Sequence, residues 1–225
     1  MDVMHTVEDS FLFLSDLGMQ KQVEEPRTLY HYPSLPQKGR IKILGDIEKY
    51  YFIDLDYHII KEVAQPYQMV EPYVEIALLK EAQNFISRDE ETQDAQDFPM
   101  GISFSVVRPT GAMSCMFCGH DTYCRGVSFI VRHKSCVDTL YPVIEKLYGS
   151  DVDSYSIIEM AGTRCLPLFQ EILTGLKNCR YNGQAAKMYL EAKAGELLAA
   201  LTHSIENLDS QAIPYYTGYE KLAVF

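Results

Sequence analysis

Hydrophobic and polar residues alternate with a period of two from Gly39 onward. In "YYFIDLDYHII" one side of the chain carries the hydrophobic residues Tyr51, Ile53, Leu55, Tyr57 and Ile59, and the other carries Asp54, Asp56 and His58. This alternation predicts a half-buried β-strand that belongs to a hairpin. The segments "YVEIALLKEA", "GISFSVVRP", "MSCMFC" and "RGVSFIVRH" continue the pattern. We therefore predict a β-rich region over residues 39–133.

The segment before this region, residues 1–38, is predicted to be an N-terminal arm with a short helix near residues 7–17. "YHYPSLPQKGR" should be extended, because Pro33 and Pro36 disfavour helix around them. "LYHYP" is compatible with a packed strand and with an arm that closes over a pocket. Further along, the acidic "SRDEETQDAQD" has no apolar period, which predicts a solvated loop.

After His133 the period becomes helical. "KSCVDTLYPVIEKLYG" and "LPLFQEILTGLKN" each predict a helix, and the longest helix is predicted from Gln184 to Leu208. One side of it is an apolar stripe, made of Ala186, Leu190, Ala194, Leu197, Leu201, Ile205 and Leu208. A neighbouring row is small, made of Ala192, Gly195, Ala199 and Thr202, which allows a close backbone approach. Packing within the chain and self-association both fit two such rows.

The predicted order is a β-rich part followed by helices, an α+β arrangement with segregated elements. The net charge is −11, from 31 acidic and 20 basic residues, and no window is a cluster of Lys and Arg. Nucleic-acid binding by these residues themselves is therefore not expected. No apolar run approaches the ~20 residues that span a bilayer. The N-terminus lacks the basic leader of a secretory signal, so we expect a cytoplasmic protein with reduced cysteines.

The segment "YLEAKAGELLAAL" resembles the "leaKalELLal" segment that closes the effector-sensing half of AraC-family transcription regulators, notably the siderophore-type branch. Three other segments agree in order: "GRIKILGDIEKYYFIDLDYHI", "EPYVEIALL" and "GVSFIVRHKSCVDTLYPVIEKLYG". The resemblance covers about residues 39–225. It implies a small cupin-like barrel or jelly roll, then antiparallel helices for dimerisation, then a DNA-binding part with two helix-turn-helix units.

On this resemblance the chain is the ligand-binding and dimerisation domain of an AraC-family regulator. Its parts are an arm (1–38), a cupin-like β-barrel sensor (39–133), a helical dimerisation segment (134–209) and a connector (210–225) toward a DNA-binding domain that this chain does not include. The implied partners are a small-molecule effector, a second copy of the chain in a homodimer, and DNA through the absent domain only. Ligand binding would then change the orientation of that domain, because the two events are thermodynamically coupled.

A candidate metal site lies in "CMFCGHDTYC", where Cys115, Cys118, His120 and Cys124 are the only nearby zinc ligands. In a strand, Cys115 and Cys118 point to opposite faces, and the chain has no second C-x-x-C. We therefore predict no metal and small core or turn cysteines, with "GHD" as a hairpin turn; zinc is the alternative.

Enzyme motifs give little support to the rival function, a stand-alone cupin-like metal-binding protein or enzyme. None of the six histidines forms the H-x-H pair that cupin metalloenzymes share. The sequence also lacks G-x-S-x-G, H-E-x-x-H and a phosphate-binding glycine loop. We expect no enzymatic activity and no cofactor.

The sequence offers more residues suited to a ligand-binding barrel than to an enzyme. The chain has 16 tyrosines, 10 phenylalanines and no tryptophan, which provide apolar bodies with hydroxyl tips. In a sensor domain the candidate ligand-binding residues are Tyr51, Tyr57, Phe104 and Arg108, where the arginine would pair with an anionic ligand. The alternative is that these are core aromatics and a surface arginine.

Overall fold

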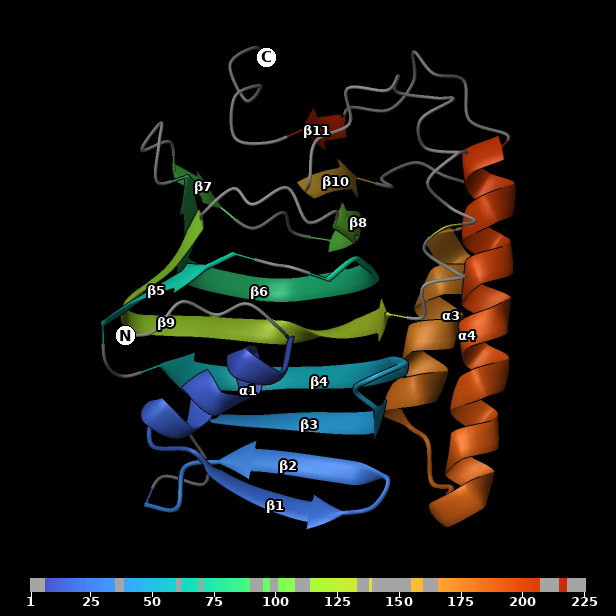
Figure 1. The fold of residues 1–225 in the computed structure, drawn as a ribbon, viewed down its shortest axis with the longest axis horizontal. Coiled ribbons are helices and arrows are strands. Elements are labelled where there is room, and N and C mark those ends of the chain that lie inside the picture. The colour runs from blue at the N-terminus through green and yellow to red at the C-terminus, as the bar shows by residue number, and fades with distance from the viewer. Residues whose placement is uncertain are drawn as a thin grey trace.

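The computed structural model describes residues 7–34, 39–59, 62–68, 71–89, 95–97, 101–107, 114–132, 138, 155–159, 166–206 and 215–217. It shows an antiparallel sheet with helices, an α+β fold (Figure 1). No helix in these ranges combines the length and the apolar character needed to cross a membrane.

Eleven strands form the sheet in the described part of the chain, and all their pairings there are antiparallel. The strands are β1 (Gln20–Glu24), β2 (Arg27–His31), β3 (Gly39–Asp46), β4 (Tyr50–Ile59), β5 (Val63–Tyr67), β6 (Tyr73–Asp89), β7 (Ala95–Asp97), β8 (Gly101–Val107), β9 (Ser114–Val131), β10 (Tyr155–Glu159) and β11 (Tyr215–Thr217). Their order is β1-β2-β3-β4-β9-β6-β8-β10-β11, with β5 on β9 and β7 on β6. The late strand β9 thus lies between β4 and β6 (Figure 1).

Three helices are described: α1 (Val7–Asp16), α3 (Leu166–Lys177) and α4 (Gly183–Glu206). α3 and α4 stand side by side and cross the direction of the strands (Figure 1). They pack on one face of the sheet, which we call the helical face, where Phe52, Ile76 and Phe129 join the helix residues in one core. Close packing is visible at Gly45, because a Cβ there would come within 3.2 Å of Leu190 Cδ1.

The opposite side of the central strands, which we call the tyrosine face, has a second core. It contains Leu14 of α1, Met19, Tyr30, Tyr32, Ile41, Ile43, Tyr51, Tyr57, Ile59, Leu79, Cys124 and Ile130. The Phe11 ring of α1 stacks on Tyr30 at 6.0 Å between centroids and meets Tyr51 edge-on at 5.9 Å. "LYHYP" therefore contributes to a packed strand, since its first three residues lie in β2.

The predicted β-strand at residues 50–59 is present, but it is not half-buried. Tyr51, Tyr57 and Ile59 are buried on the tyrosine face as expected. On the other face Phe52 is 2% exposed and Asp54 is 8% exposed. The reason is that α3 and α4 cover this face, which a two-residue period within the strand does not show.

The predicted hairpin turn at "GHD" is wrong. β9 continues through these residues as a strand of 18 residues. Its first half pairs with β5 and its second half with β4, while β6 runs along both halves. Asp121, at φ 60°, marks the change between the two halves. An irregular residue inside a long strand resembles a turn in sequence.

Other predictions need smaller corrections. The two ends of "SRDEETQDAQD" are strands, since β6 extends to Asp89 and β7 pairs with it. β10 lies in the segment predicted to be helical and β11 in the predicted connector; strands this short show no clear period. The predicted helices near residues 7–17, at "LPLFQEILTGLKN" and over residues 184–208 correspond to α1, α3 and α4. The helix at "KSCVDTLYPVIEKLYG" lies outside the described residues except for Asp138.

Candidate functional site

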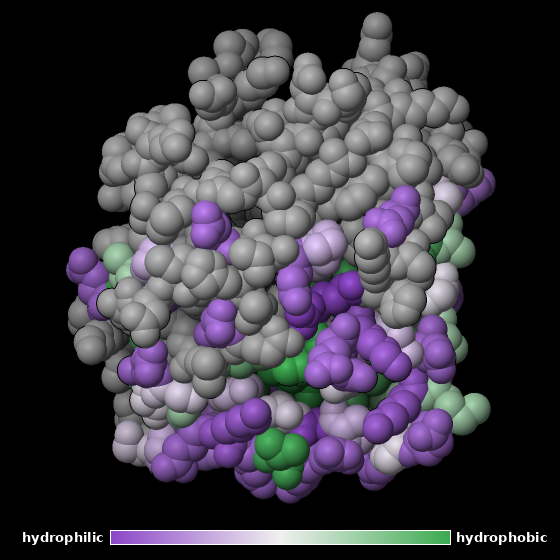
Figure 2. Space-filling view, viewed as in Figure 1, coloured by the Kyte–Doolittle hydropathy of each residue, from purple (hydrophilic) through white to green (hydrophobic). Residues whose placement is uncertain are grey.

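The two tyrosines predicted to bind a ligand come together on the tyrosine face. Tyr51 and Tyr57 are both buried, and both point away from α3 and α4. They lie six residues apart along β4. Their aromatic rings are thus core residues, and their hydroxyl groups are the polar part of this face. At the molecular surface, Figure 2 shows hydrophobic residues between hydrophilic ones in the lower half of the view.

Cys124 shares this face with Tyr57. A side-chain hydrogen bond joins the two residues. Burial raises the pKa of the Cys124 thiol to about 12, and the hydrogen bond from Tyr57 lowers it only in part. The thiol therefore stays neutral at physiological pH, which fits the predicted small core cysteine and opposes a reactive nucleophile.

Glu75 is a polar residue of this face that the sequence analysis missed. Its neighbours Val74 and Ile76 belong to the core under the helices, so alternation places Glu75 on the opposite side of β6. The hydroxyl of Ser128 in β9 donates a hydrogen bond to its carboxyl group. Burial raises the pKa of Glu75, more than this hydrogen bond lowers it. The signal available in the sequence was an acid at an inward position of "EPYVEIALL".

The structure describes only parts of the other predicted site residues. Phe104 lies in β8 with its Cα opposite those of Ile76 and Ile158. Its side chain lies outside the described part of the structure, as does all of Arg108. The backbones of Cys115, Cys118 and His120 belong to β9, but among the four zinc candidates only the side chain of Cys124 is described.

Among the described residues, no group of three His, Cys, Asp or Glu side chains is arranged to hold a metal ion. The prediction that the protein binds no metal stays a prediction.

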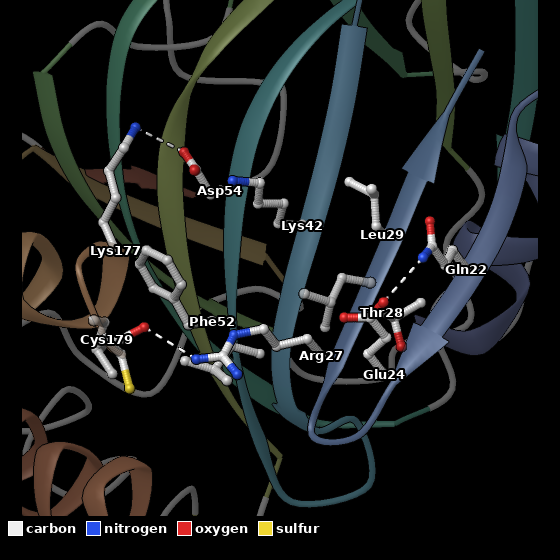
Figure 3. Close-up of a pocket in the computed structure, with 13 residues that line it drawn as sticks. Gln22, Glu24, Arg27, Thr28, Leu29, Lys42, Phe52, Asp54, Lys177 and Cys179 are labelled. Carbon is white, nitrogen blue, oxygen red and sulfur yellow. Dashed lines mark hydrogen bonds and ion pairs between the residues drawn. The ribbon is translucent and has the colours of Figure 1, made fainter. Parts of the chain in front are cut away.

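A pocket of about 360 Å³ opens on the helical face, beside the end of α3 (Figure 3). Strands β1 to β4 line one side of it, and the segment from Leu176 to Cys179 lines the other. The buried side chains of Leu44, Phe52 and Leu176 form its apolar part. The sequence analysis missed this pocket, because it joins an N-terminal hairpin to a helix about 150 residues later.

Two polar side chains of the sheet, Arg27 and Asp54, contact α3 and the segment that follows it at this pocket. The Arg27 guanidinium donates to the carbonyl oxygens of Cys179 at 3.0 Å and Tyr181 at 2.7 Å, and to Oδ1 of Asn182. Lys177 Nζ lies 2.8 Å from Asp54 Oδ1 (Figure 3). The nearly buried carboxylate is thereby paired, which removes most of the cost of burying it.

The two rows predicted on the long helix have different environments. Ala186, Leu190, Ala194, Leu197 and Leu201 of the apolar stripe are buried in the core under the helices, so that stripe packs within the chain. In the small-residue row Ala192, Gly195 and Ala199 are exposed and Thr202 is partly exposed.

The exposed row extends by one hydrophobic residue. Met188 lies one turn before Ala192 on the same side of α4 and is 62% exposed. A Cβ at Gly195 would meet no atom within 4 Å. This side of α4 is thus open to a neighbour and is not used in the described fold.

Comparisons with known proteins give no family. No family model matches the sequence, and no curated protein matches it. Among solved structures, ToxT from Vibrio cholerae O395 bound to (E)-4-(8-methylnaphthalen-1-yl)but-3-enoic acid is 11% identical with a TM-score of 0.29; the match covers 66% of this chain and 60% of ToxT. Vicilin from Corylus avellana (hazelnut) is 8% identical with a TM-score of 0.28, over 90% of this chain and 47% of vicilin. The 7S globulin of Momordica charantia is 11% identical with a TM-score of 0.25; the match covers 51% of this chain and 32% of the globulin chain.

These similarities are too low to carry a functional argument. The chain spans about 60% of the length of the ToxT chain that it matches.

Proposed function

We propose that this chain is the ligand-sensing and dimerisation part of an AraC-family transcription regulator. In this proposal a small effector binds at the tyrosine face of a cupin-like barrel, and α4 joins two copies of the chain. DNA would be contacted by a separate part that is not included in these 225 residues. The acidic charge of −11 agrees with this division, because the chain itself offers phosphates little attraction.

The observation that carries the proposal is the division of α4 into two rows. The segment "YLEAKAGELLAAL", on which the family resemblance depends, lies within α4. Its large residues bury against the sheet, while Ala192, Gly195 and Ala199 are left at the surface. In a two-fold interface one surface meets its own copy, and small residues let the two helix backbones approach closely.

The tyrosine face supplies the sensing part of the proposal. Tyr51 and Tyr57 provide buried aromatic side chains with hydroxyl groups, and Glu75 with Ser128 provides a polar group on the same face. Sites for small molecules combine these features, with a mainly apolar lining and few polar groups. An effector that binds one arrangement of sheet and helices better than another would shift the population toward it.

The experiment is light scattering on Ala199→Arg, with Thr174→Arg as the control. Both residues are exposed on a helix, but Thr174 belongs to α3 and not to the small-residue row of α4. We expect the wild type and the control to be dimers and Ala199→Arg to be a monomer with unchanged circular dichroism. An Ala199→Arg dimer, or a wild-type monomer at the highest concentration tested, contradicts the proposed interface.

A fusion assay tests the regulatory role. The chain is joined to a bacterial repressor DNA-binding domain that represses a reporter gene only as a dimer. Repression by the wild-type fusion, lost with Ala199→Arg and kept with Thr174→Arg, is the expected result. Equal repression by all three fusions would mean that α4 does not bring the copies together.

A further inference from the structure

We propose that the pocket on the helical face binds a small organic anion with an apolar body, such as an arylalkyl carboxylate. This inference goes beyond the proposed function, which places its effector on the opposite face of the sheet. It rests on three features of the pocket: its size and floor, its charge balance, and the elements that form it.

The size and floor of the pocket suit an apolar group. Its volume of about 360 Å³ lies at the lower end of the range typical of small-molecule sites, about 300–1,000 Å³. Leu29 adds a partly buried aliphatic side chain to the apolar part made by Leu44, Phe52 and Leu176. A single aromatic ring or branched aliphatic chain could cover these side chains and remove their surface from water.

The charge balance of the pocket favours an anion. Three cations line it, Arg27, Lys42 and Lys177, against the two acids Glu24 and Asp54. This gives +1 (three cations minus two acids) in a chain whose net charge is −11.

The partners of the three cations show which charges remain available. Lys177 is neutralised by Asp54. Arg27 donates only to neutral oxygen atoms among the described residues, so its positive charge is not cancelled by an ion pair there. Lys42 is exposed and makes no hydrogen bond or ion pair within the described ranges. Lys42 is therefore the group best placed to pair with a carboxylate.

The acids of the pocket limit where the anion can lie. Asp54 is opposite Lys42 in the β3–β4 register, and Glu24 is opposite Arg27 in the β1–β2 register. Asp54 already accepts from Lys177, whereas Glu24 accepts from Gln22 Nε2 at 3.0 Å. Figure 3 shows Lys42 between the part of the pocket with Asp54 and Lys177 and the part with Leu29. Leu29 is opposite Lys42 in the β2–β3 register, so a carboxylate at Lys42 can have its apolar body beside Leu29.

The elements around the pocket connect two parts of the molecule. The β1–β2 hairpin and the segment after α3 touch here through Arg27, and β4 and α3 touch here through Asp54 and Lys177. A ligand in this pocket contacts both sides of that junction. By mass action its binding stabilises the arrangement in which sheet and helices are joined.

The experiment uses three fluorinated probes of nearly the same shape and different charge. They are 4-fluorophenylacetate (anion), 4-fluorophenylacetamide (neutral) and 4-fluorophenethylamine (cation), each titrated against the full chain by ¹⁹F NMR. We expect saturable binding of the anion and binding at least about tenfold weaker for the other two probes, a difference of roughly 1.4 kcal/mol or more.

Two variants locate the bound anion, and a third is the control. Lys42→Glu reverses the charge of the exposed lysine in the pocket, and Leu29→Trp fills the space beside it. Lys187→Glu makes the same charge change at an exposed lysine of α4 that does not line the pocket. We expect Lys42→Glu and Leu29→Trp each to weaken anion binding at least about tenfold, and Lys187→Glu to leave it within about twofold of the wild type.

Three results would overturn the proposal. One is the absence of saturable anion binding at probe concentrations up to about 5 mM. The second is equal affinity for the three probes, which would mean apolar adsorption without charge recognition. The third is anion binding that Leu29→Trp leaves intact, which would place the probe elsewhere, for example on the tyrosine face. None of these results depends on dimerisation, so they do not bear on the interface tested by Ala199→Arg.

Discussion

The two faces of β4 bury polar groups in different ways. On the tyrosine face the cover is α1, a segment close in sequence, and the cysteine thiol beside Tyr57 is neutral. On the helical face the cover is α3 and α4, more than 100 residues away, and the buried carboxyl group of Asp54 pairs with Lys177. A buried polar group needs a partner on either face; on the tyrosine face Cys124 has its partner on the neighbouring strand β4, whereas on the helical face Asp54 has its partner on a helix.

This comparison predicts which contacts are most costly to lose. The helical face joins two parts of the chain, so changes there should separate sheet from helices. Changes on the tyrosine face should alter local properties and leave that junction intact.

The largest effect is expected from Phe129→Ala. The Phe129 side chain is fully buried between the sheet and the helices, so its removal leaves a cavity in that core. We expect a loss of about 3–5 kcal/mol in the free energy of unfolding, measured by urea denaturation. Val23→Ala, which truncates an exposed hydrophobic residue of β1, is the control and should cost less than about 0.5 kcal/mol. Similar losses for the two variants would mean that this core contributes little.

A smaller effect is expected from Arg27→Gln. The shorter side chain cannot reach the carbonyl oxygens of Cys179 and Tyr181, so the link between the β1–β2 hairpin and the α3–α4 connection is lost. We expect the unfolding free energy to fall by about 1–2 kcal/mol. Arg40→Gln, at an exposed position of β3, is the matched control and should change it by less than about 0.5 kcal/mol. Hydrogen exchange should increase in the α3–α4 connection of Arg27→Gln only; an unchanged rate there would contradict the link.

The smallest effect concerns the tyrosine face and appears only as a pH dependence. Because burial raises the pKa of Glu75 above its ordinary value of 4.5, the folded protein keeps a proton that the unfolded chain has already released. Stability from this group therefore falls as the pH rises from about 4.5 through the raised folded pKa. In Glu75→Gln that part of the slope should disappear, as measured by urea unfolding across this pH range. Glu81→Gln, at an exposed position of the same strand, should keep the wild-type slope, and an identical slope in Glu75→Gln would show that Glu75 does not titrate abnormally.

Local periodicity was sufficient to predict those elements whose own residue pattern shows which side is buried. The stripe Leu190, Ala194 and Leu197 predicted both α4 and its buried side, and the alternation of Tyr51, Tyr57 and Ile59 predicted one face of β4. It did not predict the burial of Phe52 and Asp54, because their cover comes from helices more than 100 residues away. The partners of a buried group are set by tertiary contacts, which a single period does not contain.

The candidate site shows the same limit. Tyr51 and Tyr57 were predicted as a pair on one face, and the structure places them there. The Glu75–Ser128 contact joins β6 to β9, and the Arg27 contacts join β2 to the α3–α4 connection. Each depends on a pairing between segments that are 53 and 152 residues apart.

The position of β9 in the sheet also has a consequence for synthesis on the ribosome. β3 and β4 can pair as soon as residue 59 has emerged, but the other edge of β4 has its partner only when β9 follows, with Tyr50 pairing to Val131. The same strand completes β6. During the synthesis of roughly 70 further residues the growing chain therefore has an open strand edge, which is the kind of surface that chaperones cover and that aggregates extend.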